Sequence, residues 1–293
     1  MHSEQVRTAP PGQDGPAAAR PARGQAGSGH RAVPAGGAAA AGGDASGDRF
    51  RHEVLSVVLQ VRERRLHVLL WQRAAAPFEG SWSLPCGPLG RDERLGTSAS
   101  RHLAAKVDLT TIAHLEQLET RSDPHRDPRG RVLATAYLAL VATDTQPRVP
   151  ADTAWHAVDR LPATAFDHGS IVRSGRERLR AKLSYTNIGF ALAPGTFTIA
   201  QLRDIYAASL GHPVSATNLQ RILTRRGVIE ATPATTQPTA AGGRPATLYR
   251  FAARSLVITN PFAAFRPPAA EGGPPGQSSP ADSADRPTRD GTG

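Results

Sequence analysis

The sequence contains a single cysteine, Cys86, among its 293 residues. One thiol excludes an intramolecular disulfide and a zinc site built from several cysteines, and it is the usage typical of a protein in the reducing cytoplasm. Long apolar runs are also missing, because no stretch of about 18 apolar residues occurs and residues 1–49 contain no apolar signal-peptide core. We therefore expect a cytoplasmic protein with no membrane partner.

Aromatic residues make up only 5% of the chain, and none precedes Phe50. Residues 1–49 consist mainly of Ala, Gly, Pro and Arg, and residues 254–293 return to Pro, Gly, Ser and Asp. Such segments bury too little apolar surface to offset the entropy lost on ordering. The sequence predicts a disordered tail over 1–49 and a mostly disordered tail over 254–293.

Acidic residues are in the minority, since 25 Asp and Glu face 35 Lys and Arg, for a formal net charge of +10. A basic chain of this kind favours an acidic partner, such as a nucleic acid or an anionic small molecule. Charge alone does not identify which of the two is bound.

Residues 50–183 alternate between strand and helix patterns. Runs rich in Val and Leu predict strands, and apolar residues at helical spacing predict amphipathic helices. Because both patterns mix within one stretch, we expect an α+β domain. The predicted strands are Val54–Val61, Leu66–Gln72, Leu115–Thr120 and Val132–Val141, and the predicted helices are Thr97–Val107 and Ile171–Leu183, the second after an N-cap at Asp167.

A second pattern follows a short linker predicted over 184–194. Thr198 and Gln201 form a capping-box signature, and Gly211 stands where that helix should end. Ser215 caps a second helix that stops before Gly227. Two strands, at 228–231 and 247–251, come next. Two helices followed by a β-hairpin predict a small winged helix-turn-helix domain over 195–253.

The second of these helices has one apolar face and one polar face. Residues 195–254 contain seven arginines against two acidic residues, and the polar face carries no carboxylate. Cations and hydrogen-bonding side chains on a helix can enter the major groove of double-stranded DNA, while flanking arginines reach phosphates. The alternative is a solvated face on a protein-binding module. The predicted DNA-binding residues are Ser215, Thr217, Asn218, Arg221, Thr224, Arg225, Arg226 and the wing-tip residue Arg244.

The segment from Arg73 to Gly87 resembles the lead into the box of Nudix hydrolases. Gly87, Glu93 and Arg101 fit the spacing of that box, and the resemblance extends over residues 50–183. It implies an α/β/α sandwich with a mixed sheet. In this family, carboxylates on the box helix hold Mg²⁺, which neutralises the diphosphate of the substrate.

The box helix lacks those carboxylates, since His102, Ala105 and Lys106 occupy the three glutamate positions, and Asp108 replaces the box glycine. We therefore assign no catalytic residue and no metal ligand to the degenerate box. A pocket with cations in these places favours an anionic nucleotide-like ligand. The predicted ligand-binding residues are Arg73, Phe78, Trp82, Arg101, Lys106, Arg126 and Arg131.

Several of these assignments have a structural alternative. Trp71, Phe78, Trp82 and Trp155 either stack a base or pack in the core. Arg126, Arg129 and Arg131 are either phosphate ligands or part of a solvated loop, and the sequence does not separate the two.

A degenerate Nudix-like domain joined to a winged helix, over residues 50–253, resembles the Nudix-related transcriptional regulators of the NrtR type. The resemblance implies a homodimer that binds operator DNA, requires no cofactor, and responds to ADP-ribose or a related NAD-linked nucleotide. Two departures are Cys86-Gly87 in place of a Gly-Gly pair, and the run from Asn218 to Arg221 in place of a more basic, Phe-containing one.

Two other functions stay open at this stage. One is a divergent Nudix hydrolase of nucleoside diphosphate derivatives, which would need Mg²⁺ and would use its C-terminal domain for assembly. The other is an interaction adaptor that neither turns over a substrate nor binds DNA.

Overall fold

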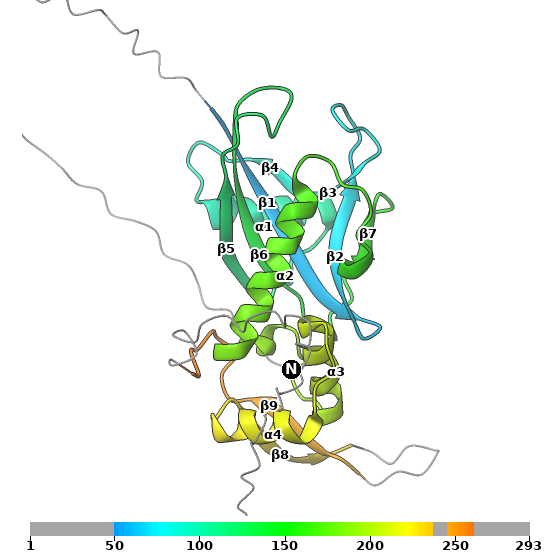
Figure 1. Cartoon of the computed structure of the whole chain (residues 1–293), viewed down its shortest axis with the longest axis vertical. Helices are drawn as coiled ribbons and strands as arrows, with labels where there is room; N and C mark the ends of the chain where they lie inside the picture. The colour runs from blue at the N-terminus through cyan, green and yellow to red at the C-terminus, as the bar shows by residue number, and fades with distance from the viewer. Residues whose placement is uncertain (1–49, 237–244, 261–293) are drawn as a thin grey trace, which may run out of the picture. The chain divides into compact units, whose positions relative to one another are not determined.

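The computed structural model describes residues 50–236 and 245–260 (Figure 1). The predicted N-terminal tail, most of the predicted C-terminal tail and the wing-tip residue Arg244 lie outside the described residues. In the part of the chain that is described, no helix is both long and apolar enough to cross a membrane.

A mixed sheet forms the centre of the N-terminal domain. Its main path runs β3-β2-β1-β6-β5, with β4 paired to β1 and β7 paired to β2. Strands β1 and β6 are parallel, and the other pairs are antiparallel. The strands are β1 (Arg51–Arg62), β2 (Arg65–Gln72), β3 (Trp82–Ser83), β4 (Cys86–Pro88), β5 (His114–Arg121), β6 (Val132–Leu140) and β7 (Thr153–Ala157). The four long predicted strands are confirmed, whereas β3, β4 and β7 are too short to give a periodic signal.

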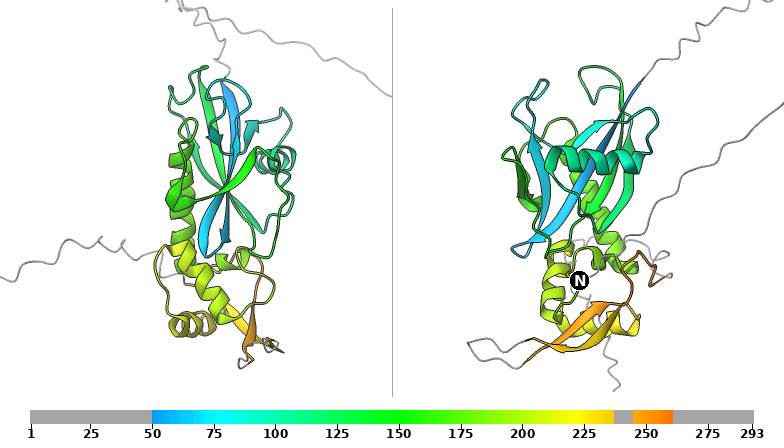
Figure 2. Two further views of the ribbon diagram at one scale, coloured as in Figure 1. Left: turned by 90° about the vertical axis from the view of Figure 1, so that its right-hand side faces the viewer. Right: turned by 180° about the vertical axis from the view of Figure 1, so that it is seen from behind.

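Two helices cover opposite faces of this sheet, α1 (Leu95–Val107) and α2 (His168–Tyr185) (Figure 2). Side chains alternate along β1, so Val57 packs in the cluster that contains residues of α2, while Val58 packs in the cluster that contains Leu103 of α1. Burial on both faces explains why β1 is an almost continuous apolar run. The predicted α/β/α sandwich is confirmed.

Helix α2 begins three residues earlier than predicted. Asp167 is its N-cap residue, but the Asp167 side chain makes no capping hydrogen bond. Its carboxylate accepts hydrogen bonds from Arg126 instead.

The segment predicted as a linker, 184–194, is largely buried. A 3₁₀-helix, Ile188–Ala191, lies in it, and residues 188–193 are all buried. Ile188, Phe190 and Leu192 belong to one apolar cluster that also contains residues of the sheet and of the C-terminal domain. These side chains join the core, so residues 188–193 are packed between the predicted domains.

The C-terminal domain has the predicted order of two helices and a β-hairpin. The capping box between Thr198 and Gln201 is present, and Gly211 ends the first helix with a φ of 75°, in the left-handed region. Ser215 caps the second helix by accepting a hydrogen bond from the backbone N–H of Asn218. The elements are α3 (Ile199–Leu210), α4 (Ala216–Arg225), β8 (Ile229–Thr235) and β9 (Thr247–Phe251).

Residues 254–260, which the predicted C-terminal tail includes, are hydrogen-bonded to the end of α2 and the residues after it. The Asn187 side chain donates to the carbonyls of Ala253 and Ser255 and accepts from the N–H of Val257. The backbone carbonyl of Tyr185 accepts from two further residues of this segment. These contacts fix residues 254–260 against the end of α2.

Candidate effector-binding and DNA-binding sites

The glycine of the degenerate box, Gly87, packs directly against His102 of α1. A Cβ atom built on Gly87 would overlap the His102 imidazole ring. The ring is buried and lies 3.0 Å from the backbone carbonyl oxygen of Pro88, to which Nε2 donates. Burial lowers the pKa of His102, so its neutral form is favoured. His102 therefore acts as a packed hydrogen-bond donor at a position where the box carries a metal-binding carboxylate.

The two other box residues, Glu93 and Arg101, bind each other. The guanidinium of Arg101 donates two hydrogen bonds of 2.7 Å to the two carboxylate oxygens of Glu93. These bonds hold the pKa of Glu93 down at about 2, and the N–H of Gly90 donates to the same carboxylate. Glu93 and Arg101 thus tie the loop before α1 to the helix.

The donor set on α1 does not fit the divalent cation that the Nudix fold uses. The three glutamate positions present an imidazole, a methyl group and an ammonium, at His102, Ala105 and Lys106. The ammonium of Lys106 lies 4.1 Å from the centre of the Trp71 ring. No cluster of three or more His, Cys, Asp or Glu side chains suited to a metal occurs in the two described ranges. Mg²⁺ needs carboxylate or carbonyl oxygens, which these positions do not supply.

The charges of three predicted ligand-binding residues act on one buried thiol. Burial and the nearby carboxylate of Glu53 raise the pKa of Cys86 to about 11, and the charges of Lys106, Arg73 and Arg126 act in the opposite direction. These three side chains come from separate parts of the sequence, yet all lie close enough to influence the Cys86 thiol.

Several of the predicted ligand-binding residues contact a short segment that precedes α2. Arg73 lies 4.9 Å from the centre of the Phe166 ring, and the Phe78 ring meets Phe166 edge-on at 4.8 Å. The next residue, Asp167, accepts two hydrogen bonds from Arg126, whose side chain is only 2% exposed. Phe166 was not among the predicted site residues, because a single phenylalanine before a helix gives no functional signal.

The remaining predicted ligand-binding residues lie elsewhere. Trp82 packs edge-on against His156, with ring centres 4.3 Å apart. Arg101 is engaged with Glu93, as described above. Arg131 lies against the Phe50 ring at 5.5 Å, and its buried Nε has no hydrogen-bond partner among the described residues. The predicted set is therefore brought together only in part.

The polar face of α4 is exposed along its whole length. Leu219 and Leu223 are buried on the opposite face. Arg221 donates to the side-chain oxygen of Asn218 at 3.4 Å, one turn earlier. The exposed face contains no carboxylate. Its exposed members are Ser215, Thr217, Asn218, Arg221, Thr224 and Arg225.

Arg226 has a structural contact instead of a free side chain. Its guanidinium donates to the backbone carbonyl of Ser184, near the end of α2, at 3.1 Å. This contact joins the end of α4 to the helix of the other domain.

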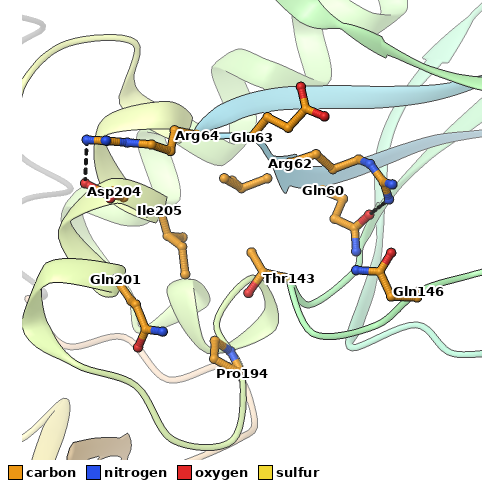
Figure 3. A pocket seen from close by; sticks show the side chains of 11 residues that line it. Gln60, Arg62, Glu63, Arg64, Thr143, Gln146, Pro194, Gln201, Asp204 and Ile205 are labelled. Atoms are coloured by element: carbon orange, nitrogen blue, oxygen red, sulfur yellow. Dashed lines mark hydrogen bonds and ion pairs between the residues drawn. The ribbon is translucent and has the colours of Figure 1, made fainter. Parts of the chain in front are cut away.

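A pocket that the sequence did not indicate lies between the turn of the β1–β2 hairpin and α3 (Figure 3). Arg64 of the turn and Asp204 of α3 form an ion pair of 3.3 Å at its edge. On the hairpin side, the buried amide of Gln60 donates to the carbonyls of Ala142 and Thr145. The two domains therefore meet through polar side chains beside their shared apolar cluster.

Both domains match known families. Residues 50–174 match the NUDIX domain, and residues 189–251 match the NrtR DNA-binding winged helix domain. A relative from Acinetobacter baylyi, described as an ADPR responsive transcriptional repressor NtrR, is 33% identical over 211 residues, which are 70% of this chain and 83% of that protein.

Solved structures show the same architecture. The structure of Shewanella oneidensis NrtR complexed with a 27mer DNA has a TM-score of 0.60 and 31% identity, and the match covers 68% of this chain and 92% of that chain. A MutT/nudix family protein from Enterococcus faecalis shares the fold, with a TM-score of 0.54, 22% identity and coverage of 70% of this chain and 87% of that chain. The chain belongs to the NrtR family of Nudix-related transcriptional regulators.

Proposed function

We propose that this regulator binds ADP-ribose or a related NAD-linked nucleotide in its Nudix-like domain, over 50–183, and operator DNA through its winged helix, over 195–253. The observation that carries this proposal is the pairing, in one chain, of an exposed α4 face without carboxylates and a Nudix box whose metal positions hold no carboxylate. The names of the Acinetobacter and Shewanella relatives, a repressor responsive to ADPR and an NrtR bound to DNA, support it.

On the DNA side, α4 lies in the major groove and its exposed polar residues contact base edges and phosphates. Arg221 and Arg225 supply the cations, and Thr217, Asn218 and Thr224 supply neutral hydrogen-bonding groups. A homodimer places two such helices on the two halves of a palindromic operator. Because the proposed partner is chromosomal DNA, we propose that the protein acts in the cytoplasm.

On the effector side, the cations around Cys86 hold the negative charge of the nucleotide. Arg73 and Lys106 are the residues concerned, whereas the predicted ligand Arg126 is 2% exposed and donates to Asp167. Charge-assisted hydrogen bonds from such groups bind phosphates without a metal ion. No divalent cation is needed, because the ligand is bound and not hydrolysed.

The two sites communicate through the junction between the domains. Val61 and Leu66 of the β1–β2 hairpin belong to the same buried cluster as Ile205 of α3. A ligand-dependent shift of the hairpin is therefore transmitted to α3 and alters the placement of α4 on DNA. The size of the response is limited by the difference in ligand affinity between the two arrangements.

The experiment that tests the proposal is selection of genomic fragments by the purified full-length protein at physiological salt, with and without ADP-ribose. We expect enrichment of a short palindromic site, and a change in that enrichment when ADP-ribose is added. A double variant, Arg221→Ala with Arg225→Ala, should lose the enrichment. The control double variant, Arg91→Ala with Arg148→Ala, removes the same charge from exposed positions of the Nudix-like domain and should keep it. Absence of enrichment by the unaltered protein in both conditions would overturn the proposal.

A further inference from the structure

The ring of Phe78, in the Nudix-like domain, is 45% exposed. We propose that the exposed ring of Phe78 is the platform on which the base of the nucleotide effector stacks, and that Phe166 is the positioning residue that holds this ring in place. The inference rests on the proposed function, because it assigns a part of the same effector site.

The three tryptophans that could stack a base are already engaged. The ammonium of Lys106 lies over the Trp71 ring, and the indole N–H of Trp71 donates to a backbone carbonyl. Trp82 packs against His156. The third, Trp155, lies beneath an arginine side chain. All three are partly buried.

Phe78 differs from the tryptophans because 45% of its surface is exposed. Its backbone has a φ of 63°, which bulky residues rarely adopt. A closed set of hydrogen bonds holds this conformation: the Arg73 side chain donates to the carbonyl of Pro77, the N–H of Gly80 donates to the carbonyl of Arg73, and the N–H of Ser81 donates to the carbonyl of Phe78. Strained residues that are held firmly in this way cluster at ligand-binding sites.

Phe166 meets Phe78 from the segment before α2 and is in the same unusual conformation. Its φ is 53°, and its ring makes a 70° angle with that of Phe78 at a centroid distance of 4.8 Å. An edge-to-face contact of this kind fixes a ring without stacking on it. Phe166 is itself held by the guanidinium groups of Arg73, at 4.9 Å, and Arg129, at 5.7 Å.

The surroundings of this aromatic pair suit a nucleotide. A purine stacks on the free face of an aromatic ring and gains affinity whatever its exact hydrogen-bonding pattern. Arg73 contacts both the Phe78 loop and the Phe166 ring, so a cation for the phosphate lies beside the platform for the base. A ligand without a base cannot stack on Phe78, but its phosphate can still contact Arg73.

Calorimetric titration of the full-length protein tests the inference with three ligands: ADP-ribose, AMP and ribose 5-phosphate. We expect Phe78→Ala to weaken the binding of ADP-ribose and of AMP about 5- to 150-fold, the range that corresponds to the loss of one base–aromatic stack. Ribose 5-phosphate has no base, so its affinity should not change. Phe78→Trp should keep the affinity for ADP-ribose and AMP.

The positioning role of Phe166 has its own readout. Phe166→Leu should weaken AMP but not ribose 5-phosphate, and Phe166→Tyr should restore AMP binding. The matched control is Phe50→Ala, since Phe50 is 49% exposed and also lies against an arginine, but does not contact Phe166. That variant should bind all three ligands normally.

Two results separate this inference from the proposed function. If the unaltered protein binds ADP-ribose and Phe78→Ala leaves its affinity unchanged, or weakens ribose 5-phosphate to the same extent, the stacking platform is overturned while the effector proposal stands. If the unaltered protein does not bind ADP-ribose at all, the effector proposal falls, and the platform falls with it.

Discussion

Asp167 and Arg126 lie 41 residues apart in the sequence and form a two-point ion pair beneath the start of α2. The Arg126 Nη2 atom donates to Asp167 Oδ1 at 2.7 Å, and its Nε donates to Oδ2 at 3.3 Å. The Arg126 side chain is 2% exposed and Asp167 is 26% exposed, so the cation is the more deeply buried partner. Asp167 thereby fixes the loop that carries Arg126 to the segment that carries Phe166.

Removal of the Asp167 carboxylate should therefore lower the stability of the protein. Asp167→Ala leaves the buried guanidinium of Arg126 without its counter-charge, and we expect it to lower the free energy of unfolding by about 3 kcal/mol. Urea denaturation followed by circular dichroism measures the change. Addition of Arg126→Met to the same protein should recover most of the loss, because the buried charge is then gone. If the double variant is as unstable as Asp167→Ala, the ion pair is not the cause.

The pairing of Asp167 with Arg126 also shows where sequence reasoning stops. Asp167 was predicted as an N-cap from its place before a helical run, and that position is right. Its side chain, however, binds a residue that only the fold brings near. Phe78 and Phe166 are 88 positions apart, and no local pattern in the sequence joins them.

The close contact between Gly87 and His102 leads to a second prediction about stability. Alanine at position 87 would overlap the imidazole ring, so Gly87→Ala should destabilise the protein by about 1–3 kcal/mol, the usual cost of overpacking a core. Thermal unfolding of the single variant and of Gly87→Ala with His102→Ala separates the cause. The double variant has room for the new methyl group and should be more stable than Gly87→Ala. Equal stability of the two proteins would mean that the backbone, and not His102, excludes a side chain at position 87.

Glu116 predicts a dependence of stability on pH. Burial opposes its ionisation, but hydrogen bonds from His114 and Lys182 outweigh burial and hold the pKa at about 2. Because the folded-state pKa is below the unfolded value of about 4.3, Glu116 stabilises the protein above that value. This stabilisation, about 2–3 kcal/mol in full, is lost as the pH falls from about 4.5 to 2.

The comparison that isolates this effect is Glu116→Gln against the unaltered protein in urea titrations between pH 7 and pH 2. We expect the variant to be less stable at pH 7, with the difference shrinking as the pH approaches 2. Glu177→Gln is the control, since Glu177 is 63% exposed and forms an ion pair with Arg180 on the same helix. If the difference in free energy of unfolding between Glu116→Gln and the unaltered protein stays constant from pH 7 to pH 2, the low pKa of Glu116 is contradicted.

The features that could be predicted from the sequence are local. Capping residues, the glycine at the end of α3 and the spacing of the degenerate box all act within a few residues of each other, and each occurs where predicted. The burial of residues 184–194 depends on distant parts of the chain. Ile188, Phe190 and Leu192 are buried in a cluster that contains residues of both domains. Whether a short apolar run packs depends on what the rest of the chain places around it.

Arg221 lies on α4 and Arg226 directly follows it, but their surroundings assign them different roles. Arg221 is exposed on α4, and among the described residues its side chain donates a hydrogen bond only to Asn218, one turn earlier on the same helix. Arg226 donates to the carbonyl of Ser184 in the other domain. Arg221→Ala should therefore leave the unfolding temperature unchanged and weaken operator DNA about 5- to 150-fold, while Arg226→Ala should lower the unfolding temperature by several degrees.

Fluorescence anisotropy with a labelled operator fragment and a random fragment of equal length, measured beside thermal unfolding, distinguishes the two roles. A base contact by Arg221 requires that its loss reduce the preference for operator over random DNA, since contacts to phosphate affect both fragments alike. Arg225→Ala, on the same exposed face near the end of α4, serves as the comparison for a phosphate contact. If Arg221→Ala loses the same affinity for both fragments, Arg221 contacts the phosphate backbone and not a base.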